Sequence, residues 1–290
     1  MVFPIFEPEE TIGQQWHRLV GSVGSWAHHP AAAARLEDVR GRLGVMFRAL
    51  GGDHGARLTA AGPAVSQHRL SFRQRLGLGT AEKLEVARFD GATLELPPVL
   101  DLLPDRADNE ALYEWLTAWF AAAGTPTQLP ADPLQADVVR LRQAGETTNG
   151  VLGAWPGLRT AHARLAAALR AARPNRRLPR QEAAVEAAVL ALLDAPGPLP
   201  AEAAEVLDPT VPLARFRAPP RYRPFLPVPL WGEMVAEREA GARGAAPQDD
   251  AGGATAAPDP RRRCRRRRTT IRRTTRTRWC STPACAPSPT

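Results

Sequence analysis

Apolar residues recur every three or four positions in several stretches of the chain, the spacing that places them on one face of a helix. The clearest stretch lies between Pro104 and Gly124, and its apolar stripe has six members. These are Leu112, Trp115, Leu116, Trp119, Phe120 and Ala123. We predict helices at residues 8–26, 31–50, 106–123, 133–144, 157–172 and 180–194.

A second pattern, in which apolar and polar residues alternate, covers residues 84–96. Its centre is the dipeptide Asp-Gly at 90–91, which is preferred in two-residue hairpin turns. That turn pairs Phe89 with Ala92 and leaves one face of the hairpin apolar. An isolated hairpin is marginally stable in water, so the apolar face must cover another element. Residues 56–60 are expected to form a third strand. The fold class is therefore mainly α, a helical domain with a small antiparallel β-hairpin or sheet.

The character of the sequence changes at Ala195, where prolines become frequent. Proline at this density disfavours helices and central strands and is typical of an extended linker. Residues 213–235 are unusually rich in aromatic and aliphatic side chains for a linker, so we expect them to lie against the helical domain. We expect residues after 240 to be disordered. The sequence therefore predicts a mainly helical domain at 1–194, a partly packed Pro-rich segment at 195–240 and a disordered tail at 241–290.

Charge is distributed very unevenly along the chain. The 290 residues carry a net charge of +8, but eleven arginines lie between Arg261 and Arg278, and no acidic residue follows Asp259. Residues 1–260 therefore carry about −3. A high isoelectric point usually suggests a nucleic-acid-binding protein. Here that argument applies only to the tail, through which we expect non-specific nucleic-acid binding.

Cysteine usage and hydropathy indicate the compartment. All three cysteines lie in the tail, at 264, 280 and 285, so the rest of the chain has no disulfide and no thiolate metal site. The N-terminal residues show no basic region followed by an apolar one, so we expect no signal peptide. No run of about 18 apolar residues occurs, so we expect no membrane insertion. These features favour a cytoplasmic protein.

The motifs of common enzymes are missing from the sequence. The single lysine, Lys83, follows no phosphate-binding loop, and no serine lies in a G-x-S-x-G motif. There is no H-E-x-x-H motif, and the G-L-G at 77–79 lacks the third glycine of a dinucleotide-binding loop. We therefore expect no catalytic, cofactor-binding or metal-binding residues, and no cofactor.

Several polar and aromatic residues still need an interpretation. The adjacent His28 and His29 precede Pro30, and we interpret them as loop residues, because neighbouring side chains rarely converge on one metal ion. His162 lies in an apolar helical stripe and is expected to be hydrogen-bonded at the edge of the core. The tryptophan pair at 115 and 119 is interpreted as core. An enzymatic reading would need a deep polar pocket that joins a histidine to a carboxylate, with candidates His17, His54 and His68.

Acidic residues near the predicted helix starts have a simpler interpretation. The pairs Glu9 and Glu10, and Asp105 and Asp108, lie where the helix dipole favours negative charge.

Three separated blocks of the sequence carry a resemblance to a known family. They read EPEETIGQQWHRLV, RLEDVRGRLGVMFRALGG and FDGATLELPPVLDLLPDRADNEALYEWLTAWFAAAG, in this order over residues 7–124. The chain resembles the N-terminal part of the NorD-type nitric oxide reductase activation proteins, with weaker similarity to about residue 235. A related and less similar family activates rubisco, which gives an alternative role.

The resemblance implies an accessory factor rather than a catalyst. Such proteins work with a MoxR-type AAA+ ATPase to mature or remodel the catalytic subunit of nitric oxide reductase, including metal insertion at its iron centre. The family's recognised metal site belongs to a C-terminal von Willebrand factor A domain and needs a D-x-S-x-S motif. No serine here has an aspartate two positions before it, so no metal residues are carried over.

The tail has two interpretations. It is either a basic arm that binds nucleic acid or the product of a shifted reading frame. With GC-rich codons, a shift turns TTIRRTTRTRWC into an acidic run followed by an apolar one, which is the order that the family shows at this point. We favour the frameshift, from about residue 261, which predicts a truncated and at most partly functional chain.

Overall fold

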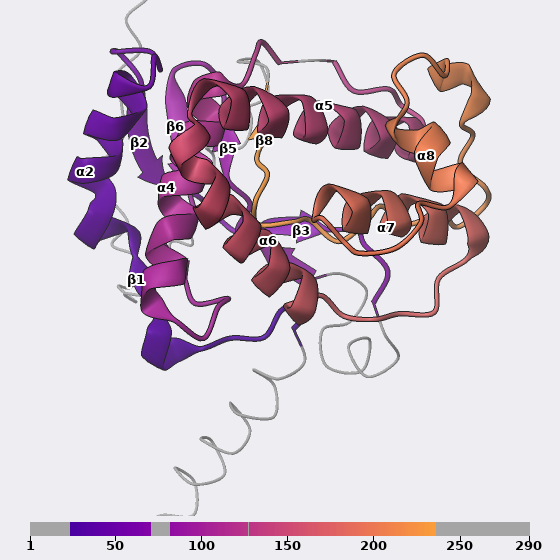
Figure 1. Cartoon of the computed structure of the whole chain (residues 1–290), viewed down its shortest axis with the longest axis horizontal. Coiled ribbons are helices and arrows are strands. Elements are labelled where there is room, and N and C mark those ends of the chain that lie inside the picture. The colour runs from indigo at the N-terminus through magenta and orange to yellow at the C-terminus, as the bar shows by residue number, and fades with distance from the viewer. Residues whose placement is uncertain (1–23, 71–81, 127, 236–290) are drawn as a thin grey trace, which may run out of the picture. The chain divides into compact units, whose positions relative to one another are not determined.

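The computed structural model describes residues 24–70, 82–126 and 128–235 (Figure 1). These residues pack as one unit. The elements, in chain order, are a 3₁₀ turn Pro30–Ala32, β1 (Ala34–Arg35), α2 (Leu36–Ala49), β2 (Arg57–Ala60), β3 (Ala64–Ser66), β4 (Glu82–Leu84), β5 (Arg88–Phe89), β6 (Thr93–Leu96), β7 (Val99–Leu100), α4 (Arg106–Ala122), α5 (Pro133–Ala154), a 3₁₀ turn Pro156–Leu158, α6 (Arg159–Ala172), α7 (Arg180–Leu192), α8 (Ala201–Leu207), a 3₁₀ turn Leu213–Arg215 and β8 (Glu233–Met234). The fold is mainly α with small sheets.

Helix α4 lies at the centre of the core, as its apolar stripe predicts. It contacts α2, α5 and α6 (Figure 1). Its two tryptophans are buried. Asp105 caps the helix by accepting a hydrogen bond from the Ala107 amide, and Asp108 lies in the first turn. The interpretation of these two aspartates as helix-start charges is confirmed. Helices α6 and α7 also match their predicted stretches, while α5 continues ten residues past the predicted end at 144.

The start of α2 corrects the sequence prediction, which began this helix at residue 31. Residues Ala34–Arg35 instead pair antiparallel with Val99–Leu100, so the helix begins only at Leu36. The backbone amides of this stretch bond to a partner that is distant in sequence, which local periodicity does not reveal. The predicted end is close to the observed one, because Gly51 turns the chain with a φ of 93°.

The largest sheet has the strand order β2-β6-β5-β8 and is mixed rather than antiparallel. Only β5 and β6 pair antiparallel, while β2 lies parallel to β6 and β8 lies parallel to β5. The predicted third strand at 56–60 is confirmed as β2. The last strand, β8, arrives from the far end of the described chain, so the sheet joins segments that are almost 150 residues apart.

The predicted hairpin register was wrong. Phe89 pairs with Leu94 rather than Ala92, so four residues lie between the paired positions instead of two. A two-residue type I′ turn needs a positive φ at both central residues, and Gly91 has one while Asp90 does not. The Asp90 carboxylate instead accepts hydrogen bonds from the amides of Ala92 and Thr93 at 2.8 and 2.6 Å. This side-chain turn stabilises the longer loop.

The region after Ala195 is not uniformly extended, which corrects the prediction from its proline content. Residues Ala201–Leu207 form α8, because this short stretch has no proline and consists of good helix formers after Pro200. Helix α8 packs on α5 and α7. Near the C-terminal end of α8, the carbonyls of Glu205 and Val206 accept hydrogen bonds from the guanidinium of Arg142.

We call residues 212–235 the strap. Its apolar side chains are buried in the same core as the helices, with Phe216, Tyr222, Leu226, Leu230 and Trp231 among them. The indole of Trp115 donates a hydrogen bond to the Leu230 carbonyl at 2.8 Å. The strap therefore completes the core beside α4 and ends as strand β8.

Some predictions fall outside the described residues. These are most of the helix at 8–26 with His17 and the acidic pair at 9–10, the G-L-G at 77–79 and the tail at 241–290. Among the helices within the described ranges, none combines the length and apolar character needed to cross a bilayer. The domain boundaries at 194 and 240 stay predictions.

Candidate functional site

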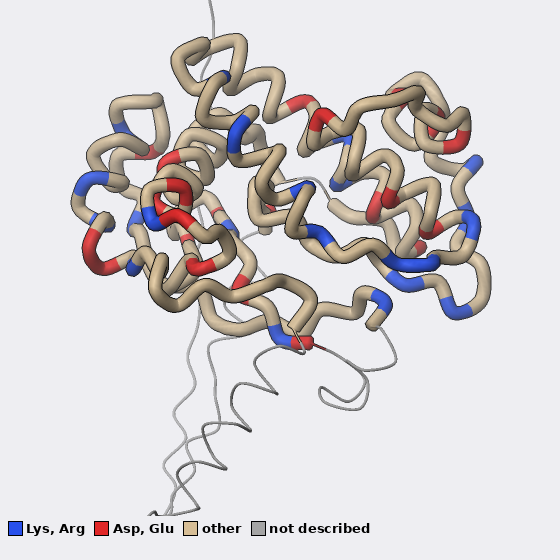
Figure 2. Tube along the Cα trace, turned by 60° about the horizontal axis from the view of Figure 1, so that its bottom comes forward, with Lys and Arg blue, Asp and Glu red and all other residues tan. Residues whose placement is uncertain are grey.

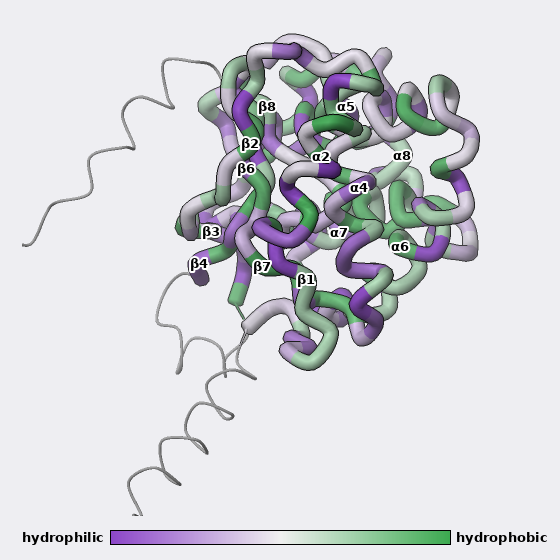
Figure 3. The backbone as a smooth tube through the Cα atoms, turned by 90° about the vertical axis from the view of Figure 1, so that its left-hand side faces the viewer, coloured by the Kyte–Doolittle hydropathy of each residue, from purple (hydrophilic) through white to green (hydrophobic). Residues whose placement is uncertain are grey.

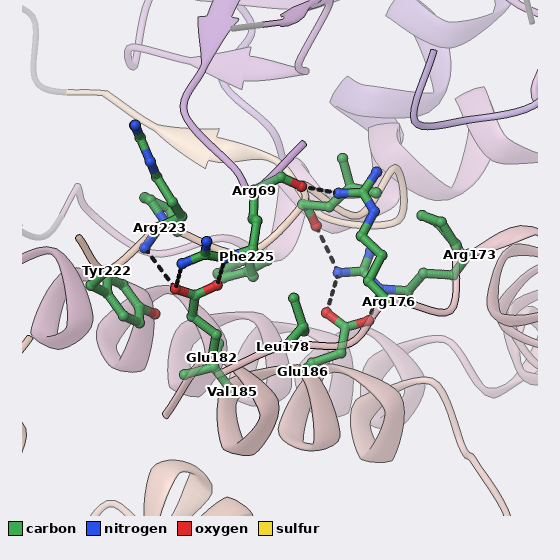
Figure 4. A pocket seen from close by; sticks show the side chains of 13 residues that line it. Arg69, Arg173, Arg176, Leu178, Glu182, Val185, Glu186, Tyr222, Arg223 and Phe225 are labelled. Carbon is green, nitrogen blue, oxygen red and sulfur yellow. Dashed lines mark hydrogen bonds and ion pairs between the residues drawn. The ribbon is translucent and has the colours of Figure 1, made fainter. Parts of the chain in front are cut away.

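A small pocket opens where α7 meets the strap and the loop that joins α6 to α7 (Figure 4). It offers about 30 Å³ of free space, which is enough for about one water molecule. Four arginines and two glutamates line it, namely Arg69, Arg173, Arg176, Arg223, Glu182 and Glu186. The functional question is whether these charges are free to act on a ligand.

Two of the arginines are held in forked ion pairs. Arg69 donates from Nε and Nη2 to the two carboxylate oxygens of Glu182, each at 2.5 Å. Arg173 donates in the same way to Glu186, at 2.5 and 2.9 Å, and also to the Leu226 carbonyl at 2.9 Å. The hydrogen bonds with Glu182 raise the pKa of Arg69. The first pair joins helix α7 to a segment 113 positions away, and the second joins it to the end of α6, so both stabilise the packing of α7.

A third polar contact connects the strap to α5. The buried Asp137 accepts hydrogen bonds from the Tyr222 hydroxyl at 2.7 Å and from the Phe225 amide at 3.1 Å. Arg140 lies 3.3 Å from its other oxygen. Burial raises the pKa of Asp137 to about 6, although Tyr222 and Arg140 oppose this rise. The carboxyl is therefore the one group of this contact that titrates near neutral pH.

The raised pKa of Asp137 predicts a pH-dependent stability. Because the folded state binds this proton more tightly than the unfolded state, the contribution is present below about pH 4 and is lost as the pH rises through about 6. The loss amounts to at most roughly 3 kcal/mol. Urea unfolding from pH 4 to 7 should show that the difference between the native protein and Asp137→Asn changes over this window. Two parallel stability profiles would contradict the assignment.

A second polar cluster lies in the core beside the pocket. Ser25 Oγ donates to Glu82 Oε2 at 2.5 Å and lies 2.8 Å from His68 Nε2, while Ser66 Oγ lies 2.8 Å from His68 Nδ1. Arg176 Nη2 donates to Ser25 Oγ at 2.9 Å. Burial raises the pKa of Glu82, but hydrogen bonds from His68 and Ser25 outweigh it, so the pKa lies below the usual value. Glu82 is therefore a carboxylate at neutral pH.

This cluster contains the residue types of a hydrolytic triad, but not its geometry. In a triad the serine and the acid contact opposite nitrogens of the histidine. Here Glu82 and Ser25 both lie at Nε2 of His68, and a second serine is at Nδ1. The proton of Ser25 points to Glu82, and its oxygen faces two further nitrogen groups, from His68 and Arg176. With the His68 side chain only 1% exposed, a substrate has no access.

The enzymatic reading required a deep polar pocket that joins a histidine to a carboxylate. His68 does contact a carboxylate, but it does not line the pocket beside α7. His54 is exposed in the turn after α2. The cluster therefore acts as a buried polar tie among the N-terminal segment, β4 and the loop before α7.

The remaining histidines have ordinary surroundings. His28 Nδ1 lies 2.8 Å from Asp101 Oδ1, and this hydrogen bond raises its pKa. His162 is buried against Trp115 with ring centroids 4.4 Å apart, and burial lowers its pKa. Its Nε2 finds no hydrogen-bond partner in the described residues, which corrects the prediction of a hydrogen-bonded histidine. Within these residues, no three metal-ligating side chains gather closely enough to hold an ion.

Charged residues on the surface of the described ranges are mixed in sign. Figure 2 shows basic and acidic positions interleaved along the chain rather than gathered into one continuous field. Many form ion pairs, such as Arg164 with Asp108 and Arg215 with Glu205. This pattern fits the negative net charge of residues 1–260.

Comparisons with known proteins identify the family. The chain is 42% identical over 238 residues to Protein NorD of Brucella abortus, covering 82% of this chain and 36% of that protein. Over the matched residues, the chain belongs to the NorD family. Protein NorD of Stutzerimonas stutzeri is 34% identical over 198 residues, which are 68% of this chain and 30% of that protein. An uncharacterised protein of Pseudomonas aeruginosa is 34% identical over 232 residues, 80% of this chain and 33% of its own length.

The NorD relatives are much longer than the match. This chain spans about a third of the length of the curated relatives it matches. No family model and no solved structure matches it. The resemblance drawn from three sequence blocks is thus confirmed, and the match extends well beyond them.

Sequence reasoning missed the pocket and the buried cluster. Several of their hydrogen bonds join residues far apart in the sequence, up to 151 positions, and they follow no local motif. The available signal was the concentration of arginines at residues 173–180, within a segment whose helices otherwise bury alanine and leucine. Arginine can be buried when it is paired with a carboxylate, and Arg173 is an example.

Proposed function

We propose that this chain is an accessory factor in denitrification that supports the activation of nitric oxide reductase. The proposal is carried by the 42% identity to Protein NorD over 238 residues. The matched region includes most of the described fold, because 238 residues are 82% of the chain. The activity of the longer relatives is extended to this chain as part of the proposal.

The geometry supports a non-catalytic role. Two of the four arginines of the pocket are held in forked ion pairs with its two glutamates, and the serine, histidine and glutamate of the buried cluster bond to one another. Groups that are paired and buried stabilise a fold, whereas a catalytic group needs access to its substrate. These features favour a protein that acts by binding a partner protein rather than by converting a small substrate.

The partners belong to the same proposal. A MoxR-type AAA+ ATPase supplies the energy of ATP hydrolysis. The catalytic subunit of nitric oxide reductase is the protein that is remodelled, during its maturation or metal insertion. The chain acts as an adaptor between them on the cytoplasmic side of the membrane. Non-specific nucleic-acid binding through Arg261–Arg278 stays a separate prediction from the sequence.

A chimeric protein tests the function without relying on the full length of this chain. In a strain that lacks its own NorD, the matched region of the Brucella protein is replaced by the matched 238 residues of this chain. We expect the chimera to restore nitric oxide reductase activity and to capture the ATPase in a pull-down. The Brucella protein without that region is the control and should restore neither.

The outcomes separate the two parts of the proposal. A chimera that accumulates normally but leaves the reductase inactive would overturn the accessory function. A chimera that restores activity without capturing the ATPase would overturn only the adaptor role.

A further inference from the structure

An open groove runs between helix α2 and the β2 side of the mixed sheet. It encloses about 500 Å³, far more than the pocket beside α7. Its walls are Glu37, Arg40, Gly41, Gly44, Phe47 and Arg48 of α2, Ala56–Thr59 and Leu94. Figure 3 faces this side of the molecule, with α2, β2 and β6 near one another as they are in Figure 1.

The floor of the groove is apolar and open. Phe47 and Leu94 are buried beneath it, while two glycines of α2 leave space where other residues would place a side chain. A Cβ at Gly41 would meet no atom within 4 Å, and one at Gly44 would meet only the Arg48 guanidinium at 3.7 Å. A chain segment can therefore approach the helix backbone closely.

The rim of the groove is basic. Arg40, Arg48 and Arg57 are exposed, and no acidic side chain of the described residues lies within ion-pair distance of them. On the side of α2 that faces α4, by contrast, Arg42 has an acidic partner, because it lies 3.2 Å from Glu114. The single acid of the groove, Glu37, lies 3.9 Å from Arg35 at the N-terminal start of α2. Within the described ranges, the rim therefore carries an excess of positive charge.

The strand beside the groove has a free edge. β2 is the outermost strand of its sheet, and no described strand pairs with its outer side. The amides of Arg57 and Ala61 donate to carbonyls of the β6 side. Since successive residues of a strand alternate in direction, the N–H and C=O groups of Leu58 and Ala60 point away from β6. Free strand edges bind extended peptides by adding a strand.

We propose that this groove binds an extended acidic segment of a partner protein. The segment adds as a strand to the free edge of β2, places carboxylates beside Arg40, Arg48 and Arg57, and seats a small apolar side chain over Phe47 and Leu94. β2 has four residues, a length of about 13 Å, so the contact covers about four to six residues of the partner. The inference does not depend on the proposed function.

A nucleic acid would satisfy the arginines but not the strand edge. Leu58 and Ala60 present donors and acceptors in alternation, which match a peptide backbone and not a row of phosphates. An acidic peptide uses both features at once.

Binding is measured on the full chain by fluorescence anisotropy at physiological salt. The probe is a labelled peptide of about eight residues in which glutamate and valine alternate, a length that exceeds the contact on β2. A block peptide of the same composition is the comparison, because the arginines at 261–278 attract both peptides equally. The groove should bind the alternating peptide more tightly than the block peptide.

Two charge-reversal substitutions distinguish binding in the groove from non-specific attraction of the peptide by positive charge. Arg48→Glu should weaken binding of the alternating peptide by about tenfold, because it places a like charge beside the peptide carboxylates. Arg177→Glu is the matched control, since Arg177 is also exposed but lies in the loop before α7. It should change the affinity by less than about twofold.

Two further substitutions test the strand edge and the open floor. Ala60→Pro removes an outward N–H without removing a bond to β6, and should weaken binding by about fivefold with little change in melting temperature. Gly41→Leu should fill the groove and block binding, while raising the melting temperature because leucine is a better helix former than glycine.

The proposal is overturned if the native chain does not distinguish the alternating peptide from the block peptide. It is equally overturned if Arg48→Glu and Arg177→Glu weaken binding to the same extent, or if Gly41→Leu binds like the native protein.

Discussion

Replacing Trp115 with alanine is expected to lower the free energy of unfolding by about 3–5 kcal/mol. The side chain is 1% exposed and lies in the centre of α4. Its indole ring packs against His162, and its N–H donates to the Leu230 carbonyl of the strap at 2.8 Å. The substitution therefore leaves a large cavity and one unpaired carbonyl in the core. A loss of this size is a large fraction of the total stability of a typical domain.

Chemical denaturation followed by circular dichroism measures this effect. Trp155→Ala is the matched control, because Trp155 is only partly buried at the end of α5 and should cost much less. Trp115→Phe separates the two contributions, since it keeps most of the ring volume but removes the hydrogen bond to the strap. An unchanged melting temperature for Trp115→Ala would show that this face of α4 is not buried.

Replacing Gly232 with alanine is expected to cost about 3 kcal/mol, at the upper end of the range for overpacking. A Cβ at this position would lie 1.8 Å from the Phe120 Cζ atom. Phe120 is itself 1% exposed and makes edge contacts with Phe89 and Trp119, at centroid distances of 6.2 and 5.1 Å. The ring cannot move without disturbing these neighbours, so the strap must shift instead.

A double-mutant cycle identifies the cause of this cost. On a Phe120→Leu background the clash is smaller, so Gly232→Ala should cost clearly less than it does in the native protein. Gly157→Ala is the control, because a Cβ there meets nothing within 4 Å. Strictly additive effects of the two substitutions would show that the Phe120 ring is not the obstacle.

The sequence alone determined the helices that bury one continuous stripe. The six apolar residues of 106–123 and the capping residues Asp105 and Asp132 act within one or two turns, so their effect can be read locally. The aromatic residues of 213–235 likewise predict burial for a stretch whose prolines suggest a linker, and Phe216, Tyr222 and Trp231 are buried.

Local pattern was insufficient where the backbone bonds to a distant partner. α2 starts late because Ala34 and Arg35 pair with residues 99–100, and the sheet is mixed because β8 returns to β5. The hairpin register depends on a side chain, Asp90, that bonds to the backbone of its own loop. Turn statistics favour a two-residue connection, and this specific hydrogen bonding outweighs them.

Only the tertiary structure decided what the charged residues do. Arg69 and Glu182 are 113 positions apart, and Arg176 and Ser25 are 151 apart, yet each pair is joined by hydrogen bonds. The same holds for the groove, where Arg40, Arg48 and Arg57 have no acidic partner among the described residues although acids are common nearby in the sequence. Hydrophobic burial follows from composition and periodicity, which the sequence carries locally. The pairing of one charge with another depends on where the folded chain brings them, and this is a property of the whole fold.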